Sequence, residues 1–286
     1  MLSNDRLLMT LLVRNEEDIL PYVLEFHREQ GVDHFIVTDN LSTDSTRDIL
    51  RHYEKMGWLT LLEEHSDDYD QEAWVTRMAI LATDPDFSAG WIIHSDADEF
   101  WLANSGTLHD YFSTLDPTVN IVSAKRHNFI CQRENASIWY ENMVFRKSVS
   151  LNYRGKLLPD KIAHRPNQNV RIAQGNHSVF GIASPLVRHD GIEILHFPIR
   201  SLSQIEQKIR LGGAAYARNT RQPAETGMGW RRLYAQLMAE GNLTSYFNEN
   251  SASKNSILEA LDRNDILLDD RIEQFFKKRQ LSWSSK

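Results

Sequence analysis

The first hundred residues alternate between short apolar runs and longer segments with helical periodicity. Residues 7–13, 34–38, 58–62 and 91–94 have the length and composition of buried strands. Three segments with a helical pattern lie between them, one that closes at Gly31 and two more at residues 45–56 and 72–82. Strands that alternate with helices in this way predict an α/β fold with a doubly wound, mostly parallel sheet.

The rest of the chain changes character twice. Strand patterns dominate residues 119–195, and the clearest are 121–124, 138–145 and 192–195. Helical periodicity then returns at residues 202–217, 230–238 and 271–278, and the polar stretch 248–255 predicts a loop. A helical extension is therefore expected behind the sheet domain.

Composition excludes several classes of protein. The net charge of −7 argues against a general nucleic-acid binder, which needs a basic face for phosphates. Cys131 is the only cysteine, so an intramolecular disulfide and a cysteine-based zinc site are both excluded. Since no stretch reaches about 18 uninterrupted apolar residues, no membrane span is expected. We therefore predict a cytoplasmic protein.

An acidic motif follows the last of the predicted strands. The sequence DADEF at residues 96–100 comes directly after the apolar WII. Carboxylates at the C-terminal edge of a parallel sheet lie where open α/β folds bind ligands. Asp96 and Asp98 could hold a hard divalent cation there, which would offset the charge that grows on a leaving diphosphate. The alternative is an acidic turn without a ligand.

A second acidic loop, DNLSTD at residues 39–44, follows the second predicted strand. Asp39 would lie at the same edge of the sheet, where it could accept hydrogen bonds from a base or a ribose. The alternative is a simple turn with a helix N-cap at Thr43 or Asp44, and Asn15 is likewise predicted to cap the helix after the first strand. Two acidic loops at one sheet edge favour a ligand site over turns alone.

Six segments in this order resemble the family 2-like glycosyltransferases of GT-A fold: VRNEED, GVDHFIVTDNLSTDST, WIIHSDADEF, KIAHRP, GNHSV and HFPIRS. The similarity is greatest to a bacterial branch with a D-x-D-E-F motif and a late H-[FY]-P-x-R-S element. It implies a hexosyltransferase-like enzyme with a nucleoside-diphosphate sugar donor and a divalent metal, Mn²⁺ or Mg²⁺. Inversion at the anomeric carbon is the default for this resemblance.

The resemblance also implies a domain organisation. Residues 1–215 would form the GT-A domain, with a nucleotide-binding half at 1–118 and an acceptor- and metal-completing half at 119–215. Residues 216–286 would form the helical C-terminal extension.

Carried over by position, the motifs imply roles on the nucleotide side. Val13, Arg14 and Glu16 would line the base pocket, and Asp39 would contact uracil or ribose, which favours a UDP-sugar. Arg77 would reach the nucleotide from the helix before the acidic strand. The alternative for Arg77 is a surface pair with Glu72 or Asp70.

The motifs also imply a metal shell. Asp98 would be the direct ligand, and Asp96 would contact ribose or a metal-bound water. His196 resembles the late histidine that completes the shell, and its nitrogen would suit Mn²⁺ better than Mg²⁺. The alternative for His196 is a structural histidine at the end of a strand.

Several charged residues could serve the transfer itself. Lys161, Arg165 and Arg200 could neutralise the diphosphate, although any of them could also be a solvated surface charge. An inverting transfer needs a base to take the proton from the attacking hydroxyl, and the candidates are Asp160, Glu141 and Asp190, with Asp160 preferred. His177 could line the acceptor or phosphate side.

Two other functions compete with this prediction. A sugar-nucleotide nucleotidyltransferase would need a glycine-rich, basic loop after the first strand, where this chain has RNEED. A catalytically silent protein of the same fold would have no need of both Asp96 and Asp98. The expected acceptor is a glycan or a lipid-linked sugar in bacterial surface polysaccharide or glycoconjugate synthesis. For a lipid-linked acceptor, WRRLY at residues 230–234 could touch the inner membrane peripherally, and a packed amphipathic helix is the alternative.

Overall fold

The structure, a computed structural model, describes residues 5–133, 138–152, 154–219, 223 and 225–279. It divides into two compact units. Unit 1 consists of Met1–Arg126 and Pro159–Leu195, and unit 2 of His127–Leu158 and His196–Lys286. The organisation that the sequence predicted, with halves at 1–118 and 119–215 and an extension at 216–286, stays a prediction.

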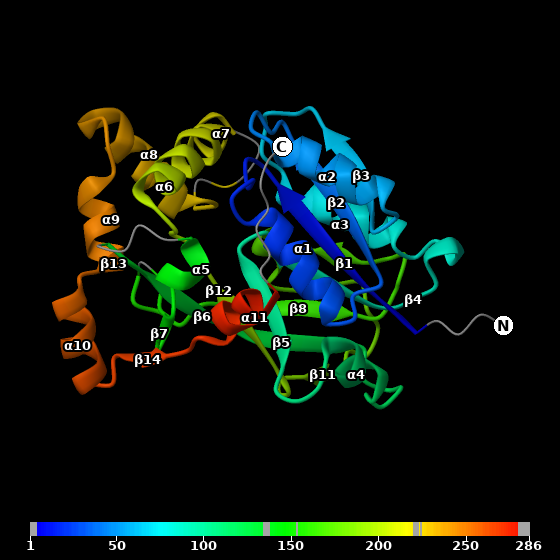
Figure 1. The fold of residues 1–286 in the computed structure, drawn as a ribbon. Coiled ribbons are helices and arrows are strands. Elements are labelled where there is room, and N and C mark those ends of the chain that lie inside the picture. The colour runs from blue at the N-terminus through cyan, green and yellow to red at the C-terminus, as the bar shows by residue number, and fades with distance from the viewer. Residues whose placement is uncertain (1–4, 134–137, 153, 220–222, 224, 280–286) are drawn as a thin grey trace. The chain divides into compact units, whose positions relative to one another are not determined.

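The central feature of unit 1 is a parallel sheet in the order β4-β1-β2-β3 (Figure 1). Its strands are β1 (Arg6–Val13), β2 (His34–Asn40), β3 (Leu59–Glu64) and β4 (Ala89–Asp96). Every pair among these neighbours is parallel, so the predicted mostly parallel α/β sheet is confirmed and is consistent with a GT-A fold. All four strands run through the predicted apolar segments because those segments can bury both faces.

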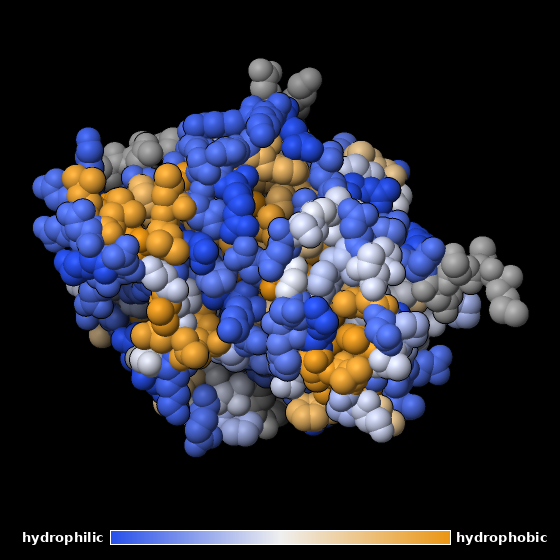
Figure 2. Space-filling view, turned by 90° about the horizontal axis from the view of Figure 1, so that it is seen from below, coloured by the Kyte–Doolittle hydropathy of each residue, from blue (hydrophilic) through white to orange (hydrophobic). Residues whose placement is uncertain are grey.

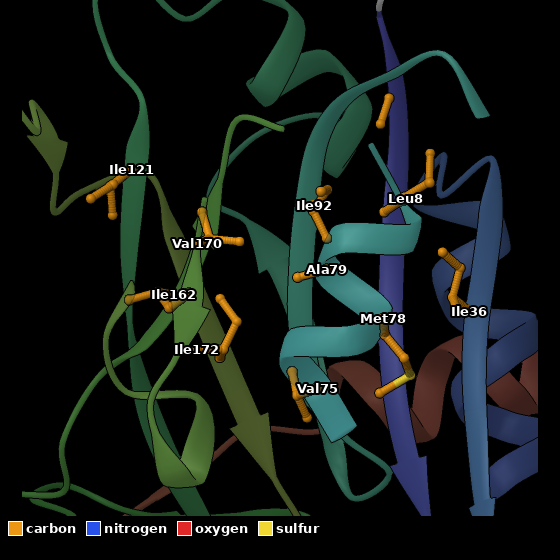
Figure 3. Close-up of a cluster of buried hydrophobic side chains, with 12 residues drawn as sticks. Leu8, Ile36, Val75, Met78, Ala79, Ile92, Ile121, Ile162, Val170 and Ile172 are labelled. Carbon is orange, nitrogen blue, oxygen red and sulfur yellow. The ribbon is translucent and has the colours of Figure 1, made fainter. Parts of the chain in front are cut away.

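The helices between these strands cover the sheet with their apolar stripes. They are α1 (Leu20–Glu29), α2 (Thr46–Lys55) and α3 (Gln71–Leu81). Figure 3 shows how α3 lies across the sheet: Met78 and its neighbours Val75 and Ala79 meet Leu8 of β1 and Ile92 of β4 in one buried cluster. Burial of these side chains holds α3 against the sheet.

Antiparallel strands extend the sheet of unit 1 beyond β4. β8 (Lys161–His164) pairs with β4, and the first part of β6 (Ile121–Gln132) pairs with β8. The remaining elements of this unit are η1 (Pro85–Phe87), β5 (Glu99–Ala103), α4 (Leu108–Ser113), β9 (Arg171–Ile172), η2 (Gln174–Asn176), β10 (Val179–Phe180), β11 (Val187–Arg188) and β12 (Ile192–His196). β9 and β10 form a short hairpin with η2 at its tip, which we call the hairpin tip.

Unit 2 combines short strands with helices. The end of β6 pairs with β7 (Phe145–Lys147) and β13 (Ser251–Ala252), and β7 pairs with β14 (Ile266–Leu268). The helices are α5 (Trp139–Asn142), α6 (Leu202–Lys208), the π-helical turn η3 (Ile209–Gly213), α7 (Ala214–Arg218), α8 (Met228–Glu240), α9 (Thr244–Asn250), α10 (Lys254–Asp262) and α11 (Arg271–Arg279). The predicted helices of this region are therefore confirmed.

Three local predictions are wrong. The predicted strand at 138–145 is α5 followed by β7, because Trp139 and Tyr140 pack as a helical pair against Phe197 and Phe276. The predicted loop at 248–255 holds the end of α9, β13 and the start of α10. Asn15 does not cap α1, which begins after Ile19.

Asn15 instead has a left-handed backbone conformation, with φ of 54°. Its side chain exchanges two hydrogen bonds with Thr43, because Thr43 N–H donates to Asn15 Oδ1 at 2.7 Å and Asn15 Nδ2 donates to Thr43 Oγ1 at 3.2 Å. Asn15 thus ties the loops after β1 and β2 together.

On the face that Figure 2 shows, apolar side chains gather in separate patches surrounded by hydrophilic side chains. The WRRLY segment lies in α8, where Leu233 and Leu237 are buried in a core cluster of unit 2. None of the helices described is long and apolar enough to cross a membrane. Peripheral membrane contact stays a prediction.

Candidate functional site

Two predicted acids lie at one edge of the parallel sheet in unit 1. In the register of the strands, Val13 at the end of β1 lies beside Asp39 of β2, and Leu12 lies beside Asp96 of β4. Parallel strands bring their carboxyl ends to the same edge, which is where open α/β sheets bind ligands. The placement of Asp39 and Asp96 that the sequence predicted is therefore present.

Asp39 is completely buried, yet one of its carboxylate oxygens accepts no hydrogen bond from the residues that the structure describes. Oδ2 accepts a hydrogen bond from Arg47 Nε at 3.4 Å. For Oδ1 there is no hydrogen-bond donor among the described residues. A buried oxygen without a donor costs about 1–3 kcal/mol, so a ligand that supplies an N–H or O–H would be favoured here.

The other residues predicted for the nucleotide side have different surroundings. Val13 and Glu16 are buried, and the Glu16 N–H donates to Thr46 Oγ1 at 2.9 Å. Arg14 forms an ion pair with Asp67 at 2.9 Å. Arg77 is half exposed and lies 3.6 Å from Glu64, which is neither of the two partners considered from the sequence.

The acidic motif spans a tight connection between two strands. Asp96 ends β4, and Glu99 begins β5. The Asp96 N–H donates to Glu99 Oε2 at 3.1 Å, which closes the turn that carries Asp98. Asp98 is itself only 3% exposed.

A buried lysine lies between the acids of this motif. Lys161 is fully buried, and its Nζ lies 2.5 Å from Asp96 Oδ2 and 3.2 Å from Glu99 Oε1. Arg126 Nη1 lies 3.4 Å from the same oxygen of Glu99. Burial alone would raise the pKa of Asp96, but the charges of Lys161 and Arg126 outweigh burial and hold that pKa below its usual value.

The hairpin tip holds the other oxygen of Asp96. Asn176 Nδ2 and Gln71 Nε2 each donate to Asp96 Oδ1 at 3.3 Å. The Gly175 N–H donates to Gln71 Oε1 at 3.0 Å, so the tip and the start of α3 share one network. Asn176 is buried with φ of 60°, and its Oδ1 has no partner within the described part of the chain. Both oxygens of Asp96 are therefore engaged, while an unused acceptor lies next to them.

His177 follows directly in this tip. Its Nδ1 lies 2.8 Å from the backbone oxygen of Asp160. Burial, together with the positive charges of Lys161 and Arg126, lowers the pKa of His177 to about 4. The imidazole is therefore neutral at pH 7.

The three candidates for the base differ in their surroundings. Asp160 adjoins Lys161, and its Oδ2 accepts a hydrogen bond from Ser123 Oγ at 2.8 Å. Asp190 is exposed and paired with Arg188. Glu141 lies on α5 of unit 2. Of the three, Asp160 is the one that joins the network around Asp96.

The remaining predicted cations and the late histidine have clear local partners. Arg165 donates from Nε to the Val119 oxygen at 2.8 Å and lies over the Trp91 ring at 4.6 Å. In unit 2, Arg200 is buried and donates to the Phe197 oxygen at 3.1 Å, and His196 Nδ1 lies 2.7 Å from Asn128 Oδ1. These contacts support structural roles for the two arginines.

Sequence reasoning missed four members of the network. Gln71 and Arg126 belonged to no motif, while Glu99 and Asn176 were noticed only as parts of DADEF and GNHSV. The partners are 3 to 104 residues apart in the chain, so pattern alone gives no signal for most of them. Within the described ranges, no group of three or more His, Cys, Asp or Glu side chains is arranged to hold a metal ion.

Comparison with known proteins gives one family and several distant structures. The model of Glycosyltransferase family 92 matches residues 10–228. Among solved structures, TarS 1-349 of S. aureus has a TM-score of 0.43 and 11% identity, over 82% of this chain and 70% of that chain. Its complex with UDP-GlcNAc has a TM-score of 0.46 and 10% identity, over 82% and 71%. None of the curated proteins compared matches the sequence.

Proposed function

Because this chain belongs to glycosyltransferase family 92, we propose that it transfers a sugar from a nucleoside-diphosphate sugar to an acceptor hydroxyl. UDP-sugars are the favoured donors, and the acceptor is a glycan or a lipid-linked sugar. The observation that carries the choice of donor is Asp39 Oδ1, a buried oxygen at the carboxyl edge of the sheet that accepts no hydrogen bond from the described residues. The motifs that resemble family 2-like glycosyltransferases and the mostly parallel sheet agree with this proposal, with inversion as the default outcome.

The chemistry of Asp39 favours uracil. The imide N–H of uracil is a single donor that Oδ1 could accept while Arg47 keeps its contact with Oδ2. Guanine offers N–H donors on one edge as well, which makes GDP the second choice. Cytosine has no ring N–H in its neutral form and offers only its exocyclic amino group, so we expect CDP to bind more weakly than UDP.

The acidic motif offers one direct carboxylate ligand for a divalent metal and one indirect contact. Carboxylate oxygens suit Mn²⁺ or Mg²⁺, and Asp98 would be the direct ligand. Asp96 suits an indirect role through water or ribose, since donors already engage both of its oxygens. His196 remains the predicted nitrogen ligand, and its Nδ1–H donates to Asn128 as the outer nitrogen of a ligand histidine commonly does. Such a metal would supply positive charge for the leaving diphosphate.

The chain's own residues would prepare this site for an anion. Lys161 and Arg126 offset the charge of Asp96 and Glu99, so that a diphosphate would meet a nearly balanced network rather than bare carboxylates. The closed turn from Asp96 to Glu99 would keep Asp98 in place before the donor binds.

Thermal unfolding with UDP, GDP and CDP, each with and without Mn²⁺, tests the donor site. A ligand at a hundredfold excess over its Kd stabilises the fold by about 2.7 kcal/mol. For a chain of this size the midpoint should rise by roughly 5 °C or more, most with UDP and Mn²⁺. Asp39→Ala should reduce the shift and the preference for UDP, while Asp190→Asn, which changes an exposed acid, should leave both unchanged. The absence of a shift with every nucleotide would refute the proposal.

The metal is tested separately with Asp98→Asn. This variant should fold normally, lose the Mn²⁺-dependent part of the shift and lose nearly all turnover. His196→Ala should also reduce the Mn²⁺-dependent part. Turnover above a tenth of the wild-type rate in Asp98→Asn would exclude Asp98 as the metal ligand.

A further inference from the structure

We propose that His177 is the catalytic base, and that its Nε2 accepts the proton of the attacking hydroxyl group. This inference rests on the proposed transfer function and deepens it by naming the proton acceptor.

One hydrogen bond of His177 defines its tautomer. The Asp160 backbone oxygen can only accept, so His177 Nδ1 must carry a hydrogen and donate it across 2.8 Å. In the neutral ring the other nitrogen, Nε2, then carries a lone pair. That lone pair has no hydrogen-bond partner among the residues that the structure describes, and the side chain is only half-buried. Nε2 is therefore an acceptor that a ligand can reach.

Two bonded segments hold the ring beside Asp96. Asn176, the residue before His177, donates to Asp96 Oδ1. Lys161, the residue after Asp160, lies against Asp96 Oδ2. The imidazole is thus anchored on both sides by residues that bind one carboxylate of the acidic motif. A group held by these anchors keeps its orientation while a substrate binds.

Gly175 leaves the required space on the Nε2 side of the ring. A Cβ at this position would lie 2.6 Å from His177 Nε2 and 2.7 Å from Cδ2. Its φ of +77° is in the left-handed region, which also favours glycine. Any larger residue at position 175 would therefore crowd Nε2, which glycine leaves uncovered on this side.

The tautomer also decides which ligand group Nε2 can meet. A lone pair repels the oxygens of a diphosphate but accepts a hydrogen from a hydroxyl. Lys161 and Arg126 disfavour a charged ring in the free protein, and Asp96 favours it. A diphosphate bound near the two cations would offset their charge, so the ring would become more basic as the donor binds.

In the reaction, the acceptor oxygen forms a bond to the anomeric carbon of the donor sugar. The bond from that carbon to the diphosphate oxygen breaks, and its electron pair leaves with the nucleoside diphosphate. The hydroxyl proton moves to His177 Nε2 and is later released to water. Asp160 then has a positioning role through its backbone oxygen, while its side chain stays with Ser123.

The test is His177→Asn, with His189→Asn, the same change at an exposed histidine, as the matched control. Asparagine at position 177 can still donate near the Asp160 oxygen but has no Nε2. Turnover is measured as release of UDP from the UDP-sugar that gives the largest thermal shift, with water as the acceptor. We expect His177→Asn to lose about 100- to 10,000-fold in turnover and to keep the full UDP and Mn²⁺ shift. His189→Asn should keep its turnover and its nucleotide shift, because this exposed ring takes no part in the network described around Asp96.

Added imidazole should restore part of the turnover of His177→Asn but not that of Asp98→Asn. The base assignment is overturned if His177→Asn keeps more than a tenth of wild-type turnover, or if it loses the nucleotide shift as well. If no nucleotide binds even to the wild-type chain, the proposed function itself fails.

A second measurement does not depend on turnover. Nitrogen-15 spectra of the histidine rings distinguish the two neutral tautomers and the charged ring, and His177→Asn identifies the signal. We expect a neutral ring with its hydrogen on Nδ1 at pH 7. A hydrogen on Nε2, or a charged ring at pH 7, would exclude His177 as the base even where the wild-type chain shows no hydrolysis.

Discussion

Two histidines of unit 1 share one tautomer but differ in what their second nitrogen does. His27 of α1 donates from Nδ1 to the Val23 oxygen at 2.8 Å, and its Nε2 accepts a hydrogen bond from the backbone N–H of Trp101 in β5 at 3.0 Å. His177 makes the same kind of Nδ1 bond at the hairpin tip, but in the described part of the chain nothing bonds to its Nε2. His27 is fully buried, and His177 is half-buried.

This difference shows that a low pKa does not by itself mark a functional histidine. Burial is the largest cause in both cases, and it lowers the pKa of each ring to about 4. The two rings differ in the Nε2 lone pair. In His27 it accepts the backbone N–H of Trp101, and in His177 it is available to accept a proton. Whether each ring nitrogen has a hydrogen-bond partner is therefore the better indicator of a functional histidine here.

A pair of buried histidines gives the comparison a third case. His164 Nδ1 donates to the Arg165 oxygen, so its Nε2 accepts from His94 Nε2 at 2.9 Å. His94 Nδ1 then accepts from Thr10 Oγ1 at 2.7 Å. All four ring nitrogens are satisfied, as in His27, and the pair ties β1, β4 and β8 together.

The largest expected effect is the loss of stability in His27→Ala. The change leaves the buried Trp101 N–H without an acceptor and opens a cavity beside Phe26 and Phe100. We expect a loss of about 3–5 kcal/mol in the free energy of unfolding, measured by urea denaturation. His177→Ala should cost only about 1 kcal/mol, because it breaks one hydrogen bond of a half-buried ring. Equal losses in the two variants would contradict the distinction between them.

The next effect is a loss of stability in acid. The folded pKa of His27, about 4, lies below its unfolded value of 6.5, so the unfolded chain binds more protons between these values. Stability from this ring is complete above pH 6.5 and is lost as the pH falls towards 4. One such ring should cost about 2 kcal/mol between pH 6.5 and 5.

The slope of unfolding free energy against pH checks this expectation. His27→Gln should lower the slope by about one proton. His164, with a pKa of about 4, and His94 act in the same direction and remain in the variant. His177→Asn should lower the slope less, since water screens a half-buried ring. An unchanged slope in His27→Gln would show that His27 does not stay neutral.

The sequence was sufficient to predict the sheet that positions these rings. Each of the first four strands is an apolar run bounded by polar residues, and a parallel sheet buries such runs on both faces. The segment 138–145 misled the prediction because Trp139 and Tyr140 sit in a single helical turn that tertiary packing stabilises. Four residues are too few to show a helical period.

The acidic site was predictable only where residues stand at strand ends. Asp39 and Asp96 follow apolar runs, so their shared edge could be inferred. The sequence singled out Lys161 and His177 as candidates, but it could not show that Lys161 Nζ lies between Asp96 and Glu99 or that His177 Nδ1 meets the Asp160 oxygen. Such partners depend on how β8 and the hairpin tip meet α3 and β4, which no local pattern encodes.

A smaller effect is expected from Thr10→Val. The change removes the hydroxyl that donates to His94 Nδ1 and leaves that buried lone pair without a donor. We expect a loss of about 1–2 kcal/mol in unfolding free energy.

Thr38→Val is the matched control for this change. Thr38 is also fully buried, on the neighbouring strand β2, but its Oγ1 has no hydrogen-bond partner in the ranges described. Removal of an unpaired hydroxyl should be neutral or slightly stabilising. If both variants lose the same stability, steric change rather than the His94 bond is the cause.

The smallest effect is the difference in unfolding free energy between Gly175→Ala and Gly57→Ala. This difference is also the closest test of the comparison. Both glycines have a positive φ, at +77° and +75°, so each alanine should cost about 1 kcal/mol from backbone strain. A Cβ at position 57 meets nothing within 4 Å, whereas one at position 175 meets His177 Nε2 at 2.6 Å. The ring can swing away but then loses its bond to the Asp160 oxygen, which adds about 1 kcal/mol in Gly175→Ala alone.

In the His177→Asn background this extra cost should vanish, because the shorter side chain no longer reaches the alanine. A double-mutant cycle by urea denaturation measures the coupling between the two positions. A coupling of zero would mean that Gly175 does not keep the Nε2 side of the ring open.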